Sequence, residues 1–130
     1  MKSRNSRESK HDRGAVAVEF ALIIPIFLAL VVGIVEFSYA YNLQISVTQA
    51  AREAARTMAI KDDQSKAALA AIAGAPGLSG EDFELAFTPD ACGDDADDMT
   101  VTVTYPAATL TGLFGSTVTV TGVGAMRCGG

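Results

Sequence analysis

The sequence predicts an α+β protein: a long N-terminal transmembrane and amphipathic helix, a short second helix, and a small three-stranded antiparallel sheet with one disulfide. Three observations support this. Residues 15–35 are apolar apart from one glutamate, a helical apolar period continues to about residue 60, and two Thr/Val-rich segments alternate with the period of a strand. A chain of 130 residues leaves room for one small domain beside the apolar helix.

Charge is distributed unevenly along the chain. Residues 1–13 hold five basic and two acidic side chains, a net charge of +3, so residues 14–130 hold five basic and thirteen acidic ones, a net charge of -8. The positive-inside rule predicts that residues 1–14 form a cytoplasmic basic leader and that residues 36–130 form an extracytoplasmic α+β domain. An acidic body does not suit phosphate backbones, so we expect no nucleic-acid partner.

Residues 15–35 have the length of a single membrane pass. At 1.5 Å per residue these 21 residues span about 31 Å as a helix, enough to cross the hydrocarbon layer. One alternative is a buried core helix, although a small domain rarely encloses a helix that is apolar all round. Another is a secretory signal cut after Ala40, for which the apolar run is longer than the usual 7–15 residues.

Glu19 is the one charged residue in this apolar segment, and two interpretations account for it. It is either an interfacial side chain near the start of the helix, or a partner for a new amine created by cleavage before Ala15. In the second interpretation Glu19 of one subunit pairs with the amine of a neighbour and sets their stagger. Pro25 removes one backbone hydrogen bond, so we expect a kink there.

The sequence RGAVAVEFALIIPIFLALVVGIVEF, residues 13–37, resembles the opening of TadE-like pseudopilins of the tight adherence (Tad) pilus system, within the type IV pilin-like superfamily. The resemblance rests on a basic leader, Gly14 before the cut, Glu19 followed by Phe20, and Pro25 in the apolar run. It extends to about residue 60 through VTQAAREAAR. It reappears in VTVTYPAATLTGLFG and VTVTGVGAMR near the end.

The resemblance implies that a prepilin peptidase cuts between Gly14 and Ala15, and that Glu19 with Phe20 sets the assembly register. Many type IV pilins have Phe or Met where this chain has Ala15, which leaves methylation of the new terminus undetermined. The implied protein is a minor structural subunit of the bacterial cytoplasmic membrane, in or at the base of a surface pilus. Its partners would be the membrane, the peptidase, other pilin or pseudopilin subunits and the Tad assembly machinery.

Two other functions remain open on the sequence. One is an unprocessed single-pass envelope protein whose outer domain binds a partner. The other is a secreted module that begins at Tyr41. The mature N-terminus distinguishes all three, because only the pseudopilin begins at Ala15.

Beyond the apolar run, the period of an amphipathic helix continues through small and apolar side chains, and we expect the alanine-rich stretch 50–59 to pack on the protein's own sheet. A second helix is predicted from near Ser65, ending at APGLSG. Strands are predicted at 83–88, 100–105 and 116–127. The buried positions predicted for the long helix are Leu43, Val47, Ala51, Ala54 and Met58.

Cys92 and Cys128 form an even pair in a domain expected to face an oxidising space, so a disulfide is predicted, with two unpaired buried thiols as the alternative. In the last strand, Val118, Val120, Met126 and Cys128 should share a face. Gly122 and Gly124 would leave room there for close packing or for a bulge.

No catalytic or cofactor-binding residue is predicted. The only histidine, His11, lies in the leader, and both cysteines are expected to be paired, so the outer domain lacks the usual base and thiol nucleophile. The loop 90–98 is rich in aspartate but lacks the spacing of a calcium loop, so we expect a solvated acidic loop and no metal. The acids in question are Asp90, Asp94, Asp95, Asp97 and Asp98.

Overall fold

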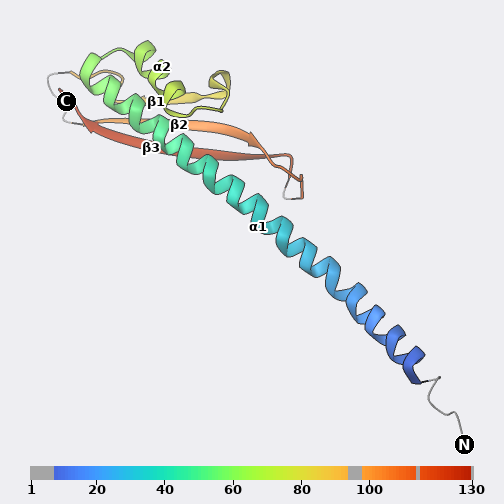
Figure 1. The fold of residues 1–130 in the computed structure, drawn as a ribbon. Helices are drawn as coiled ribbons and strands as arrows, with labels where there is room; N and C mark the ends of the chain where they lie inside the picture. Colours follow the sequence, from blue (N-terminus) through green and yellow to red (C-terminus); the bar gives the residue numbers. More distant parts are fainter. Residues whose placement is uncertain (1–7, 94–97, 114, 130) are drawn as a thin grey trace, which may run out of the picture. The chain divides into compact units, whose positions relative to one another are not determined.

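The computed structural model describes residues 8–93, 98–113 and 115–129, with side chains from residue 14 onward. The chain divides into two compact units, Met1–Phe37 and Ser38–Gly130. In the described part of the chain, the elements follow one another in the order α1 (Glu8–Lys61), α2 (Gln64–Gly74), the 3-10 turn η1 (Gly80–Asp82), β1 (Glu84–Thr88), β2 (Asp98–Ala108) and β3 (Thr117–Arg127) (Figure 1).

Helix α1 starts earlier than the apolar segment that we expected to open it. It begins at Glu8 rather than at Ala15, and its helical assignment continues through Gly14 and Pro25 to Lys61. Half of the helical residues before Gly14 are good helix formers, namely Glu8, Lys10 and Arg13, and a single glycine costs a helix only about 1 kcal/mol. Neither the leader residues nor Gly14 therefore ends the helix at the boundary between the leader and the apolar segment.

Helix α2 begins close to the predicted Ser65 and has a capped N-terminus. A carboxylate oxygen of Asp63, the N-cap residue, accepts a hydrogen bond of 3.1 Å from the backbone N–H of Lys66. The Lys66 ammonium also lies 2.9 Å from the other oxygen of that carboxylate. The helix ends at Gly74, directly before the predicted Ala-Pro-Gly sequence, where Gly77 has a φ of 93°.

The three predicted strands are present and form one antiparallel sheet in the order β1-β2-β3. Leu85 pairs with Val103 between β1 and β2, and Tyr105 pairs with Val120 between β2 and β3. Strand β2 extends beyond the predicted 100–105 at both ends. Met99 near the start of β2 and Ala107 near its end are both buried, so these two residues also face the core.

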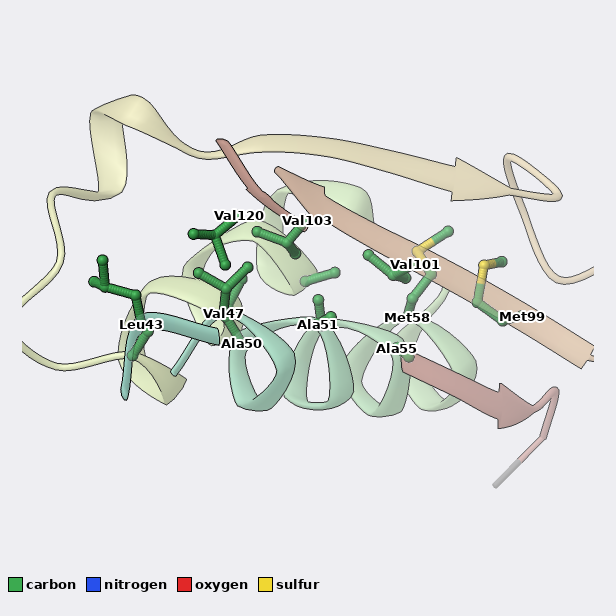
Figure 2. Packing of buried hydrophobic residues seen from close by; sticks show 14 of the residues in the cluster. Leu43, Val47, Ala50, Ala51, Ala55, Met58, Met99, Val101, Val103 and Val120 are labelled. Carbon is green, nitrogen blue, oxygen red and sulfur yellow. The ribbon is translucent and has the colours of Figure 1, made fainter. Parts of the chain in front are cut away.

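The core of the Ser38–Gly130 unit lies between the helices and one face of this sheet (Figure 1). Figure 2 shows Val47 and Met58 of α1 directed toward Val103 and Val101 of β2. All five helix positions predicted to be buried are buried, and the alanine-rich stretch packs inside the protein as expected. Ala67 and Ala71 of α2 complete the same core.

Gly122 and Gly124 of β3 lie directly against the backbone of α1. A β-carbon built on Gly122 would lie 2.5 Å from the carbonyl oxygen of Val47, and one built on Gly124 would meet the backbone of Ala51 still more closely. Of the two explanations offered by the sequence, close packing is therefore the one observed. Val120 on the same face is buried, whereas Val118 and Met126 are exposed near the strand ends.

Candidate functional site

The predicted processing site, Gly14 and Ala15, lies within the helical part of the Met1–Phe37 unit. Both residues are exposed, and nothing lies within 4 Å of where a β-carbon on Gly14 would be. The basic residues of the leader before Glu8 lie outside the described residues.

The predicted register residues follow within the next two turns. Glu19 is exposed, and the Phe20 side chain is 63% exposed. Ala15 and Glu19 are four residues apart on one helix, which places them on the same face with a rise of about 6 Å between them. An amine created at Ala15 would thus lie one turn from a carboxylate on the same side of α1.

Around these residues, α1 presents an uninterrupted apolar surface. Every residue from Gly14 to Val31 is exposed, and this helix is the one in the described part of the chain that is long and apolar enough to cross a membrane. The burial expected of a core helix is absent from this segment, so the core-helix alternative is wrong. Its composition and exposure suggest a membrane anchor.

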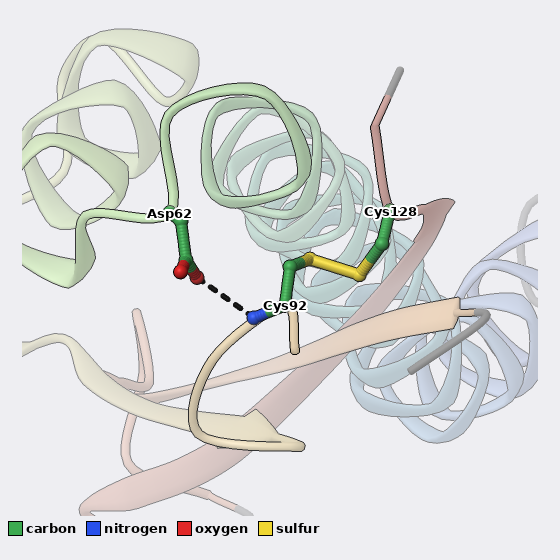
Figure 3. The surroundings of a disulfide bond; sticks show 3 residues. All are labelled: Asp62, Cys92 and Cys128. Carbon is green, nitrogen blue, oxygen red and sulfur yellow. Dashed lines mark hydrogen bonds between the residues drawn. A yellow bond between two sulfur atoms is a disulfide. The ribbon is translucent and has the colours of Figure 1, made fainter. Parts of the chain in front are cut away.

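Cys92 and Cys128 form the predicted disulfide, with their Cα atoms 5.7 Å apart (Figure 3). Cys92 lies after β1, and Cys128 directly follows the last residue of β3. The bond therefore fixes the end of the final strand to the loop between β1 and β2. The alternative of two unpaired thiols is wrong.

Polar contacts that the sequence did not indicate attach this disulfide to the end of α1. The Asp62 carboxylate accepts a hydrogen bond of 2.7 Å from the backbone N–H of Cys92, as Figure 3 shows, while Asp62 itself has a φ of 47°. The Gly129 N–H donates to the Ala59 carbonyl at 3.0 Å. One signal in the sequence could have indicated this role of Asp62. It follows the last turn of a predicted helix, where the chain often adopts the left-handed conformation that Asp tolerates.

Among the shallow hollows on the described surface of the Ser38–Gly130 unit, two run beside α1. The larger, about 500 Å³, is lined by side chains from α1 and by the loop after α2, with Tyr39, Asn42, Pro76 and Leu78 among them. The smaller, about 240 Å³, is lined by α1 residues that include Tyr41 and Arg52. Neither lining contains histidine, cysteine or a carboxylate, so neither brings together the groups of an acid–base site.

Within the described residues, no three His, Cys, Asp or Glu side chains are grouped as metal ligands. Asp94, Asp95 and Asp97 of the acidic loop lie outside the described residues, as does the side chain of His11.

A comparison with protein families matches residues 14–56 to the family described as TadE-like protein. No curated protein and no solved structure is significantly similar to the chain. The matched segment begins at Gly14, covers the exposed apolar surface with Glu19, and ends within the amphipathic part of α1. The sheet and its disulfide lie beyond it. Over this segment, about a third of the chain, the sequence is similar to TadE-like proteins.

Proposed function

We propose that this protein is a minor, pilin-like structural subunit used to assemble a Tad-type pilus. It is held in the bacterial cytoplasmic membrane by the apolar part of α1, with its N-terminus in the cytoplasm and the Ser38–Gly130 unit outside. The observation that carries the proposal is the TadE-like match, which begins at the glycine of the proposed cleavage site. The exposed apolar surface that follows supports it.

In this proposal, a prepilin peptidase hydrolyses the peptide bond between Gly14 and Ala15. The basic leader is released with a carboxylate on Gly14, and the mature chain gains an ammonium on Ala15. Removal of the leader also takes away the +3 charge that holds the N-terminus at the cytoplasmic face. The mature helix can then shift along its axis relative to the membrane during assembly.

Glu19 supplies the proposed register. A carboxylate in lipid costs about 2.5 kcal/mol or more, and a nearby ammonium offsets part of that cost. The chain's own Ala15 amine lies one turn away on the same face, so pairing within one chain competes with pairing between neighbours. Pairing between neighbours satisfies the charges of both subunits only at one stagger, and this selects one axial offset.

The outer unit supports a minor role. Residues 38–130 have their own core, sheet and disulfide, whereas Tad major pilins resemble a bare helix with a short tail. A folded domain of this size suits a subunit that starts or caps a fibre better than one that repeats along it. Pro25 would kink the apolar helix and adjust how it packs against its neighbours.

Substitutions at Glu19 test the register role. We expect Glu19→Ala and Glu19→Gln to be processed normally but to be depleted from pili or assembly complexes isolated after crosslinking. Glu19→Gln retains the size of the side chain and removes its charge. Val18→Ala, at a neighbouring exposed position, controls for a general disturbance of the helix surface. Normal incorporation of both Glu19 variants would contradict the proposal.

A second candidate function is an unprocessed single-pass envelope protein whose outer domain binds a partner. The separate core and disulfide of residues 38–130 favour it, because such a domain needs no assembly to be folded. Gly14→Val separates the two functions. A pseudopilin should lose processing and assembly in this variant, whereas an unprocessed envelope protein should be unaffected.

A further inference from the structure

The loop between β2 and β3, residues 109–116, exposes two leucines. Leu110 is 54% exposed and Leu113 is 70% exposed. A loop that serves only to connect two strands in water is usually polar, so this pair needs an explanation. Phe114 lies outside the described residues.

Polar groups of this loop are bonded within the loop itself. The Thr109 N–H donates to the Ser116 carbonyl at 3.2 Å, and the Thr109 hydroxyl donates to the Gly115 carbonyl. The Gly115 N–H donates to the Gly112 carbonyl at 3.3 Å. Because these groups are already paired, moving the loop into a less polar medium costs less than it would for an open loop.

The loop lies at the Ser38 end of the outer unit. Strand β3 runs in the same direction as α1, so its start, and the loop before it, lie toward the start of the helix within this unit. Figure 1 shows the loop at the opposite end of the sheet from the C-terminus. Contacts between helix and strand that establish this direction join Gln44 to Thr121, Val47 to Gly122, Ala51 to Gly124, and Ala59 to Gly129.

The β2–β3 hairpin carries its charged residues at the end far from the loop. No charged residue occurs between Asp98 and Arg127, which pair with each other at the end far from the loop. Asp62 and Asp90 lie at that same end, beside the disulfide. The β2–β3 hairpin therefore combines exposed leucines with an absence of charge at its loop end. The acidic residues at that end of the unit, Glu81, Asp82 and Glu84, lie in η1 and at the start of β1.

We propose that the β2–β3 loop contacts the lipid bilayer and inserts Leu110 and Leu113 at the boundary between headgroups and acyl chains. Lipid is the partner because the chain passes from Ser38 directly into the exposed apolar segment, so the loop lies at the end of the unit closest along the chain to the membrane. Tyr41, 62% exposed just inside this unit, is a side chain typical of that interface. The proposal depends on the membrane anchor and not on processing or pilus assembly.

A single-tryptophan reporter tests the contact, since the chain contains no tryptophan. The full chain carrying Leu113→Trp is reconstituted in phosphatidylethanolamine–phosphatidylglycerol vesicles that include a phosphatidylcholine brominated near the glycerol end of its acyl chains. Leu110→Trp is a second reporter in the same loop. Ala91→Trp, at an exposed position next to Cys92, is the matched control at the end far from the loop.

We expect both loop reporters to emit at shorter wavelength than Trp at position 91, to lose intensity to the brominated lipid, and to be quenched several-fold less by aqueous iodide. Emission and quenching equal to those of the control would overturn the proposal. Protection from iodide without quenching by the brominated lipid would overturn it too, because the loop would then be covered by protein, such as a second copy of this chain.

Discussion

Gly122 of β3 faces the carbonyl oxygen of Val47 in α1 at a separation that leaves no room for a methyl group: a β-carbon would lie 2.5 Å from that oxygen. The atom it would meet is backbone, which cannot move aside as a side-chain tip can. The same relationship recurs one turn along the helix, at Gly124 and Ala51. Two glycines thus set how closely the last strand approaches the helix.

Gly122→Ala should destabilise the Ser38–Gly130 unit by about 1–3 kcal/mol, the usual cost of overpacking a core. Chemical denaturation of the purified full chain in detergent measures the change in the free energy of unfolding. Gly93→Ala is the matched control, because nothing lies within 4 Å of a β-carbon there. Equal stability of the two variants would show that helix and strand are not in tight backbone contact.

Asp62→Ala should cost about 1–2 kcal/mol of unfolding free energy, because it removes the acceptor for the Cys92 N–H and places alanine at a positive φ. Asp62→Asn retains an acceptor oxygen and a side chain that tolerates this conformation, so it should cost less. Thermal unfolding of the two variants side by side measures the difference. If Asn is as damaging as Ala, the hydrogen bond is not the reason that Asp62 matters.

Removal of the disulfide should loosen the end of β3 before the rest of the sheet. The bond closes a sequence separation of 36, and the double variant Cys92→Ser, Cys128→Ser should lose roughly 4 kcal/mol on the chain-entropy model. Amide hydrogen exchange should rise most at Ala125–Arg127 and least at Val101 and Val103 in the central strand. A uniform rise across all three strands would contradict the local role.

The start of α2 should depend on pH through Asp63. The Lys66 ammonium, followed by the Lys66 N–H, holds the pKa of this carboxyl below its ordinary value of 3.8. A lowered pKa in the folded state means that its contribution is present above pH 3.8 and is lost as the pH falls through the lowered value. The protection factor of the Lys66 amide, which is the intrinsic exchange rate at each pH divided by the observed rate, should therefore fall at low pH in the wild type but not in Asp63→Asn, which caps without titrating. The same pH response in both chains would exclude Asp63 as its source.

The sequence predicted the elements of this fold well because their periods are strong. Residues 100–105 alternate without interruption and residues 116–121 do the same, while the small side chains after Leu43 repeat at helical spacing. The structure confirms the buried face of the helix and of the central strand; in the last strand Val120 is buried, but Val118 and Met126 are exposed. The disulfide followed from two cysteines and an expected compartment. The periodicity of a helix or strand can be read within a short segment, and the disulfide follows from the number of cysteines.

The contacts that join distant segments were less predictable. Asp62 meets Cys92 thirty residues away, and Gln44 donates to the Thr121 carbonyl at 2.8 Å across 77 positions. No periodicity encodes such pairs. The early start of α1 was missed for another reason: the change from basic to apolar residues marks a change of environment and not the end of a helix. The roles of Gly14, Ala15 and Glu19 are implied by the resemblance to TadE-like pseudopilins, and they stay predictions.

The central claim is that the chain is cut between Gly14 and Ala15, and the mass of the intact native protein tests it most directly. In cells with an active prepilin peptidase, the account predicts a mature chain of 116 residues that begins at Ala15, after loss of the first 14 of 130. Cells that lack the peptidase should yield the full-length chain. Native protein that still carries residues 1–14 while the peptidase is active would contradict the account.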